Sequence, residues 1–367
     1  MFVTGPEETR RRIAKVGRYH LYLFLLPVIS VLYYGWLTAS QLNERADNPQ
    51  RVAPLARRGR ILDHLGAPLA HNVHGEREYP LGEAAGSLVG YQLRGKNQTG
   101  LEAALQAKLS PPLPPAGLAA ALEQDQEVKR GVHGRLMGPD ITLTLDAGMQ
   151  RALYDAIQPL SGAIAVVDSE GRILAAVSSP SFDSNSVGEQ WQKLRSDPRS
   201  PFIERVGSGL YPVTLAGELP LMSPDNLEYH WFSDDPFPGY PLDSSAAWIE
   251  GRLFVTPLML VELAFQLAGQ AETPSPSLLP GDSIVRRPLP AAPDLVPDLK
   301  AEGVLVWALQ GPRFRESPEF LVLMGEVQPG PHYFSVVLES AGSPAREVLE
   351  QKVLPAIVKQ VRTQHTL

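Results

Sequence analysis

The sequence predicts an α/β (α+β) sandwich, preceded by one N-terminal transmembrane helix and a small, mainly β pedestal domain. The first observation behind this prediction is an apolar run at residues 21–39 that follows a basic cluster. The second is a group of short segments between residues 60 and 80, which read as strands bounded by turn residues. The third is the order of the longer segments after residue 140: strands first, helices in the middle, strands and a helix last. That order is typical of a sheet packed against helices.

Composition excludes several classes of function. The 367 residues are 44% hydrophobic, which is enough to bury a sizeable core. The formal net charge of -7 argues against nucleic acid as a partner, because nucleic-acid-binding proteins usually carry a clustered basic face. The chain has no cysteine, so it has no thiolate nucleophile, no cysteine-ligated metal and no disulfide.

Residues 19–40 are predicted to be a transmembrane anchor that follows a cytoplasmic tail at residues 1–18. At about 1.5 Å per residue, the apolar run spans a hydrocarbon core of about 30 Å. Tyr33 and Trp36 lie toward its outer end, where aromatic rings favour the membrane interface. A cleaved signal peptide and a buried helix of a soluble protein are the competing interpretations, but the length of the run and its lack of a polar face favour the anchor. Five basic residues precede the run and should keep the tail in the cytoplasm: Arg10, Arg11, Arg12, Lys15 and Arg18.

Two domains are predicted after the anchor. Residues 41–135 comprise a polar stalk and the pedestal, with strands at 60–63 and 68–70, an amphipathic helix at 100–109 and a Pro-rich linker at 110–117. Residues 136–367 form the α/β sandwich. Its elements are expected to be a strand at 141–146, a helix at 147–158 with Leu153 and Ile157 facing inward, a hairpin at 162–177, a buried helix at 256–268 with Thr256 as N-cap, strands at 320–324 and 334–338, and a final helix at 345–361.

Several short motifs follow one another in a recognisable order. They are RGRILD at 58–63 with Gly66 and Leu69, YPLG at 79–82, VGY at 89–91, GLE at 100–102, TLTLD at 142–146, the segment from Ala176 to Asn185, and GRLFVTPL at 251–258. Together they resemble the class B penicillin-binding proteins, the monofunctional transpeptidases of bacterial peptidoglycan synthesis. One departure is His64, which stands where the family commonly has arginine. The resemblance runs nearly end to end and implies a transpeptidase-like sandwich on a dimerisation-type pedestal.

The catalytic motifs of that family are not found in this sequence. Acyl transfer on this scaffold needs a serine activated by the lysine of a Ser-x-x-Lys motif, and no serine here is followed by lysine at that spacing. The Ser-x-Asn and Lys-Thr-Gly motifs are also missing, and residues 303–312, where the latter is expected, contain no lysine. Residues 202–206 and 209–212 resemble the approach to the family's nucleophile, and the match stops at Pro212. Ser208 is a weak catalytic candidate, because no lysine or histidine is placed to activate it. These absences predict a pseudo-transpeptidase that is not an enzyme.

Other candidate sites receive simpler interpretations. His71 and His74, with Glu76 and Glu78 close by, are expected to form a surface cluster rather than a metal site. Asp168 and Asp183 are expected in turns. No cofactor is predicted. The aromatic and acidic segment at residues 222–247 is expected to cover exposed core, and a partner surface is the alternative.

The predicted function is a membrane-anchored scaffold or regulator of peptidoglycan synthesis in cell division or cell elongation. The resemblance implies a SEDS-type glycosyltransferase or another cell-wall synthesis membrane protein as partner. Non-covalent binding of peptidoglycan in the former cleft is a weaker option, because the carboxylate-binding motif is missing. It places the chain in the bacterial cytoplasmic membrane with most of its mass on the periplasmic side. The partner-binding candidates are Tyr33, Trp36, Arg58, Arg60, Asp63, Tyr79, Gly100 and Glu102. The alternative is an active D,D-transpeptidase or carboxypeptidase with a rearranged serine site that still binds penicillin.

Overall fold

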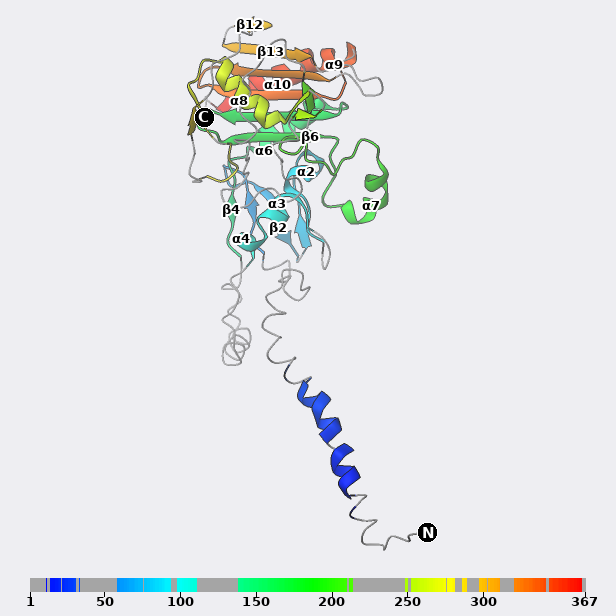
Figure 1. Ribbon diagram of the computed structural model, residues 1–367. Coiled ribbons are helices and arrows are strands. Elements are labelled where there is room, and N and C mark those ends of the chain that lie inside the picture. The colour runs from blue at the N-terminus through cyan, green and yellow to red at the C-terminus, as the bar shows by residue number, and fades with distance from the viewer. Residues whose placement is uncertain are drawn as a thin grey trace. The chain divides into compact units, whose positions relative to one another are not determined.

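The structure is a computed structural model, shown in Figure 1. It describes residues 11, 14–20, 22–30, 33, 58–74, 76–93, 98–110, 138–209, 211–213, 248–249, 252–274, 276–280, 286–288, 297–301, 303–310, 320–340 and 343–364. The chain divides into two compact units, one formed by residues 1–53 and 113–135 and the other by residues 54–112 and 136–367. The predicted boundary between residues 135 and 136 stays a prediction.

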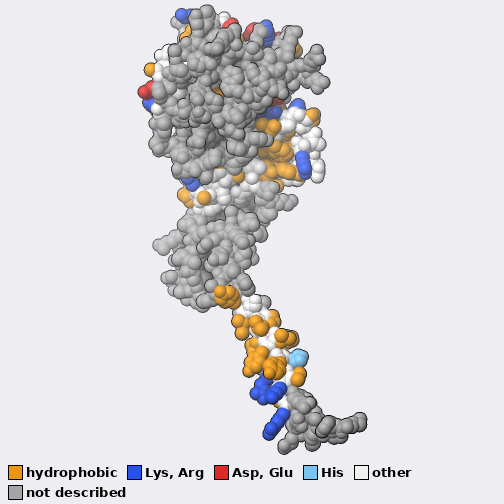
Figure 2. All heavy atoms as spheres, viewed as in Figure 1, with side chains coloured by type: hydrophobic (Ala, Val, Ile, Leu, Met, Phe, Trp, Pro, Cys, Tyr) orange, Lys and Arg blue, Asp and Glu red, His pale blue; other side chains and the backbone are white. Residues whose placement is uncertain are grey.

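In the first unit, the described residues between 11 and 33 are helical and exposed. Figure 2 shows hydrophobic side chains along most of this helix and Lys and Arg side chains gathered near its beginning. Within the described ranges, no helix combines the length and hydropathy that a membrane span requires.

The second unit begins with residues 58–110, which we call the pedestal segment. Strands β1 (Ile61–Leu62), β2 (Pro68–Val73) and β3 (Glu76–Glu78) pair antiparallel in sequence order, and β4 (Ile141–Thr142) adds to β1 in parallel. The sheet order is therefore β3-β2-β1-β4. Three short helices and one 3-10 turn complete the segment: η2 (Gly82–Ala84), α2 (Gly86–Val89), α3 (Gly100–Ala104) and α4 (Gln106–Leu109).

The centre of the unit is a six-stranded sheet with the order β12-β13-β14-β15-β5-β6, antiparallel throughout. Its strands are β5 (Gly162–Asp168), β6 (Ile173–Ser179), β12 (Leu299–Ala301), β13 (Val304–Gln310), β14 (Leu321–Val327) and β15 (His332–Leu338). Every residue of β5, β6, β14 and β15 is buried, as expected for strands covered on both faces.

Helices cover the two faces of this sheet. On one face, α8 (Pro257–Leu267) contacts β15, β14 and β5, and it begins as predicted with Thr256 capping the backbone of Met259. On the other face, α6 (Ala147–Ile157) packs on β6 with Leu153 and Ile157 fully buried, which confirms their predicted inward orientation. The C-terminal helical segment joins α6 there and consists of α9 (Ser343–Val348), η6 (Leu349–Val353, a π-helix) and α10 (Leu354–Gln364).

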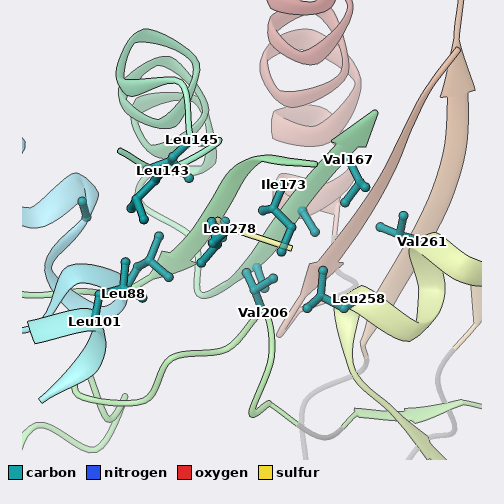
Figure 3. Packing of buried hydrophobic residues seen from close by; sticks show 14 of the residues in the cluster. Leu88, Leu101, Leu143, Leu145, Val167, Ile173, Val206, Leu258, Val261 and Leu278 are labelled. Atoms are coloured by element: carbon teal, nitrogen blue, oxygen red, sulfur yellow. The ribbon is translucent and has the colours of Figure 1, made fainter. Parts of the chain in front are cut away.

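The pedestal segment and the α8 face of the sheet share one hydrophobic core. Figure 3 shows Leu88 and Leu101 of the pedestal segment near Leu143 and Leu145, and the cluster continues through Ile173, Val206 and Leu278 to Leu258 and Val261 of α8. The small sheet and the large sheet of the second unit are therefore joined by continuous hydrophobic packing.

The remaining elements lie outside the large sheet. They are α7 (Val187–Ser196), a sheet of β7 (Tyr211–Val213), β9 (Arg252–Val255) and β8 (Trp248–Ile249), and the pair β10 (Glu272–Pro274) and β11 (Arg286–Pro288). The predicted strand at 141–146 is shorter than expected, because the amide of Thr144 donates to Leu278 and Asp146 turns away to cap α6. The predicted final helix at 345–361 is present as a helical segment over residues 343–364, with a π-helical turn at Leu349–Val353.

Candidate functional site

A buried ion-pair cluster holds the pedestal segment together. Glu102 on α3 is fully buried, and Arg58 Nε and Arg77 Nε lie 2.6 Å and 2.7 Å from its two carboxylate oxygens. With two guanidinium groups and one carboxylate, the cluster carries an excess positive charge. Burial lowers the pKa of Arg58, and the nearby carboxylate of Glu102 opposes that shift.

The two arginines also reach the backbone and the amide side chains around them. Arg58 donates to the carbonyl oxygen of Glu102 at 2.5 Å and to the side chain of Gln106. Arg77 donates to the carbonyl oxygen of Gly59 at 2.9 Å and to Asn72 Oδ1 at 3.2 Å. Strands β2 and β3 and helices α3 and α4 are therefore fixed to one charged centre.

Tyr79 connects the pedestal segment to the chain that follows β6 of the large sheet. Its hydroxyl accepts a hydrogen bond from the Gln92 amide at 2.8 Å. Asn185, which follows β6, accepts from the Tyr79 amide at 2.9 Å and donates to its carbonyl oxygen at 3.0 Å. Burial raises the pKa of Tyr79, so the hydroxyl is neutral at physiological pH and contributes as a hydrogen-bonding group only.

Gly100 occupies a position that other residues cannot fill without strain. Its φ of +58° is left-handed, and a Cβ built on it would lie 2.5 Å from the Leu88 carbonyl oxygen and 2.7 Å from the Gly90 nitrogen. Gly90 has a φ of +75°, and its Cβ would lie 1.9 Å from the carbonyl oxygen of Thr99. The close approach of α2 and α3 therefore depends on both glycines.

The other predicted partner-binding residues differ in exposure. Asp63 is 3% exposed and organises the turn that follows β1. Arg60 is exposed and pairs with Asp140 at 2.6 Å, and this contact lowers the pKa of Asp140. Tyr33 is 56% exposed on the N-terminal helix, whereas Trp36 lies outside the described residues. Among the described candidates, only Arg60 and Tyr33 expose their side chains; the buried ones can affect a partner only through the surface that they shape.

Ser208 lies in a turn organised by a buried carboxylate. Glu204 Oε1 accepts from the Val206 amide and Glu204 Oε2 from the Gly207 amide, both at 2.8 Å, and the Ser208 amide also bonds to this carboxylate. Burial raises the pKa of Glu204, against the opposing effect of these backbone donors. Ser208 itself is half-buried. Its backbone is therefore held firmly, but no Lys lies within a helical turn of it in the sequence to act as a base.

An arginine fixes the segment just before and after this turn. Arg205 Nε donates to Glu339 Oε1 at 2.7 Å, and its guanidinium also donates to the carbonyl oxygens of Arg199, Ser200, Ile203 and Pro180. Tyr211 donates to the same oxygen of Glu339 at 3.3 Å, and burial raises its pKa well above the usual range. Strand β7 is thus tied to the end of β15 at the point where the similarity to the nucleophile motif ends.

The segment predicted to stand in for the Lys-Thr-Gly strand is β13. It pairs with β14 along its whole length and with β12 over Val304–Val306. Beyond that pairing, the Ala308 amide donates to Asp298 Oδ2 at 2.7 Å. The strand is present where the resemblance places it, but it carries no lysine in its sequence.

The other sequence candidates have structural roles. His71 and Glu78 face each other across β2 and β3 at 3.7 Å, and no group of metal-binding side chains is found among the described residues. Asp168 and Asp183 accept hydrogen bonds from amides of their own turns, as predicted. The aromatic segment at residues 222–247 lies outside the described residues.

Comparison with known proteins relates the chain to cell-wall transpeptidases. No family model matches it. It is 31% identical over 150 residues to the peptidoglycan D,D-transpeptidase PbpA of Mycolicibacterium smegmatis, over 37% of this chain and 29% of that protein. It is 30% identical over 171 residues to the peptidoglycan D,D-transpeptidase MrdA of Salmonella typhimurium, over 38% of this chain and 27% of that protein. The chain thus matches less than a third of the length of either relative.

Solved structures extend the similarity to most of the chain. The crystal structure of PBPA from Mycobacterium tuberculosis superposes with a TM-score of 0.57 at 17% identity, covering 83% of this chain and 99% of that one. The D,D-transpeptidase domain of a peptidoglycan glycosyltransferase from Eggerthella lenta superposes with a TM-score of 0.55 at 19% identity, covering 86% of this chain and 100% of that one. The chain has a penicillin-binding transpeptidase fold. Over the aligned segments it is homologous to class B penicillin-binding proteins.

These findings confirm the transpeptidase-like α/β part of the predicted fold, and they overturn one prediction about activity. The transmembrane helix and the separate pedestal domain stay predictions. The prediction that the chain is not an enzyme is wrong. Its relatives are named peptidoglycan D,D-transpeptidases, so the homology points to an enzyme family. Sequence analysis also missed Arg77, Glu204 and Glu339 as members of the charged clusters. The signal for Glu204 was available, since it lies in the segment that resembles the approach to the nucleophile.

Proposed function

We propose that the chain is a membrane-anchored component of bacterial peptidoglycan synthesis that binds a SEDS-type glycosyltransferase through its N-terminal helix and pedestal segment and positions or regulates the synthesis complex. Homology to peptidoglycan D,D-transpeptidases supports the process. The observation that carries the binding role is the construction of the pedestal segment, where Glu102, Arg58 and Arg77 form a rigid buried centre and leave Arg60 on the surface.

Rigidity supports a binding role for a physical reason. A surface that is already held in its bound shape loses little conformational entropy when a partner binds. The pedestal segment also shares its core with the large sheet, so a partner held there would hold the whole unit in a defined orientation. In this proposal the basic residues before residue 21 face the cytoplasm and the compact unit containing both sheets lies on the periplasmic side of the membrane.

The first test is co-purification of the full chain with the SEDS-type glycosyltransferase of the same cell, in detergent, followed by size-exclusion chromatography and a lipid II polymerisation assay. We expect a stable complex and a changed polymerisation rate. Arg60→Glu should weaken the complex without unfolding the chain, because Arg60 is exposed and its reversal changes the charge of the surface. An enzyme that elutes alone and polymerises at an unchanged rate would contradict the proposal.

A second candidate function, acyl transfer, is suggested by the activity for which the relatives are named. They are named D,D-transpeptidases, and one solved neighbour, penicillin-binding protein A from M. tuberculosis, is described as a ceftriaxone acyl-enzyme complex. In this chain Ser208 is the serine nearest the expected nucleophile, and Glu204 holds its backbone. This candidate function is acyl transfer or carboxypeptidase activity by a rearranged serine site.

Labelling with a fluorescent penicillin tests this second function. If Ser208 is acylated, the full chain should give a stoichiometric covalent band and Ser208→Ala should abolish it. Ser200→Ala is the matched control, because Ser200 is an exposed serine of the preceding loop and should not alter labelling. Absence of a band from the wild-type chain, alongside a labelled class B protein, would remove acyl transfer by Ser208.

A further inference from the structure

Glu204 is a buried carboxylate that has no cationic partner among the described residues. It is 4% exposed, and none of the ion pairs in that part of the chain includes it. Arg205, the next residue, pairs instead with Glu339 at 2.7 Å. An ionised carboxylate that is buried without a counter-charge is costly, so the chain must either hold the charge by other means or bind a proton there.

Backbone amides hold the negative charge of Glu204. Its Oε1 accepts from the Val206 amide and its Oε2 from the Gly207 amide, both at 2.8 Å, and the Ser208 amide also bonds to this carboxylate. Successive N–H groups directed at one group of oxygens are an arrangement that binds anions. The turn at residues 204–208 is therefore built for the ionised form of the side chain.

Ser178, on β6, supplies the hydrogen-bond partner that a protonated Glu204 would need. Its hydroxyl oxygen lies 3.4 Å from Glu204 Oε1 and accepts from the Arg205 amide at 2.8 Å. A hydroxyl that donates to a carboxylate usually lies at about 2.5–2.7 Å, so this contact is long for the ionised pair. A hydroxyl oxygen has two lone pairs, and the one that Arg205 leaves over can accept from a carboxyl O–H.

The charged and titratable groups around Glu204 compensate one another. On the same loop and at the end of β15, Arg205 and Glu339 form an ion pair. On β7, Tyr211 donates to Glu339 Oε1 at 3.3 Å, and burial holds the pKa of Tyr211 well above its usual range, so its hydroxyl is neutral. From β6 comes the uncharged Ser178, and the start of α8 meets the turn through a backbone hydrogen bond. Glu204 is thus the group of this cluster whose charge is left uncompensated.

The turn has one side that water can reach. Gly207 and Ser208 are half-buried, whereas Val206 is fully buried. Water can therefore replace the carboxylate at the amides of residues 207 and 208. Burial also raises the pKa of Glu204 above its ordinary value of 4.5, and this effect outweighs the opposing one of the amide donors. Proton binding is thus displaced toward neutral pH.

We propose that proton binding at Glu204 is a switch that loosens the turn at residues 204–208. In the ionised form the carboxylate holds the three amides. A proton taken up from solvent goes to Glu204 Oε1, the new O–H donates to Ser178 Oγ, and the amides of Gly207 and Ser208 pass to water. This turn leads into β7, so the proton sets the position of the segment that resembles the approach to the family's nucleophile. The switch requires neither glycosyltransferase binding nor acyl transfer, and it is tested separately from the proposed function.

Hydrogen exchange of the full chain, read by mass spectrometry on a peptide that contains residues 204–209, is the first test. The measurement covers about pH 4–8, which includes the ordinary range of a glutamate and the range above it. After correction for the intrinsic effect of pH on exchange, this peptide should exchange roughly tenfold faster in the protonated form, because hydrogen bonds to the carboxylate are lost. Glu204→Gln, a neutral side chain of the same shape, should exchange at the fast rate at every pH. Asp183→Asn changes another turn carboxylate and should keep the wild-type transition.

The urea midpoint gives a second readout with a defined sign. Because the pKa of Glu204 is raised in the folded chain, folding favours its protonated form. That contribution to stability is complete below the pKa of the unfolded chain and is lost as the pH rises through the folded pKa. The wild-type midpoint should therefore fall relative to that of Glu204→Gln over this range.

Two results would overturn the switch. The first is a peptide 204–209 that exchanges at one corrected rate across the whole pH range in the wild-type chain, since Glu204 would then keep one protonation state. The second is a transition that persists in Glu204→Gln, which would assign it to another group. The wild-type measurement decides even if Glu204→Gln does not fold.

Discussion

Glu102→Gln is expected to destabilise the folded chain by about 3–5 kcal/mol, the typical cost of removing one partner from a buried ion pair. The substitution keeps the size of the side chain but removes the only carboxylate between Arg58 and Arg77, both of which are almost fully buried. The two guanidinium groups would then remain close together in a medium that screens their repulsion poorly. Urea unfolding of the full chain, followed by circular dichroism, measures the loss.

Two further variants make this prediction specific. Asp140→Asn removes the carboxylate of the exposed Arg60–Asp140 pair and should shift the urea midpoint far less, because water and salt screen that pair. Removing all three charges together, by Arg58→Met, Arg77→Met and Glu102→Leu, should recover part of the stability lost in Glu102→Gln, since no unpaired charge is left buried. A Glu102→Gln midpoint no lower than that of Asp140→Asn would disprove the central role of the cluster.

Gly90→Ala is expected to cost about 2–5 kcal/mol, and it is the second large effect. Part of the cost is the backbone, because Gly90 has a φ of +75° and a ψ of −156°, a region that is essentially restricted to glycine and costs another residue about 1–3 kcal/mol. The rest comes from overlap with the carbonyl oxygen of Thr99, which would lie 1.9 Å from the new Cβ and belongs to the backbone beside α3. The measurement is again the free energy of unfolding in urea.

Gly66→Ala is a reference variant with a positive φ and no steric overlap. Gly66 has a φ of +85°, but nothing lies within 4 Å of the position of its Cβ. It should therefore show only the backbone cost of about 1–2 kcal/mol. If Gly90→Ala and Gly66→Ala were equally destabilised, the packing of α2 on α3 would not depend on close backbone approach.

Local sequence patterns were sufficient for the elements that are stabilised locally. The helix at 147–157 and the hairpin of β5 and β6 appear where periodicity and turn residues predict them. Thr256 and Pro257 mark the start of α8 for the same reason, since capping involves only neighbouring residues. In each case the residues that determine the structure lie within one or two turns of one another.

Predictions were less accurate where distant contacts decide. The strand after Asp140 stops at Thr142 because the Thr144 amide and hydroxyl bond to Leu278 and Ile173, and no local pattern reports those partners. The resemblance to class B proteins located Arg58 and Glu102, but it did not show that Arg77 completes their cluster. That contact exists only once β3 lies beside α3.

The candidate site shows the same division. The sequence located the segments that correspond to the nucleophile approach and to β13. The structure places β13 in the six-stranded sheet, whereas the nucleophile approach leads into β7 of the separate three-stranded sheet. The inference from missing motifs to missing activity did not follow, because the relatives by sequence are enzymes. The absence of a motif concerns only which residue types occur at a given spacing in the sequence. Activity depends on which side chains come together in the folded chain.

The common core of the pedestal segment and the large sheet constrains the order of events during synthesis. Leu88 and Leu101 leave the ribosome early, but Leu278, a residue of the same core, is made long afterwards. The early segment therefore cannot complete its apolar contacts alone. Until the later segments are made, its leucines stay exposed, where chaperones can bind them and where they favour aggregation. A fragment that begins after residue 135 would lack Leu88 and Leu101, which lie near Leu143 and Leu145 in the same core.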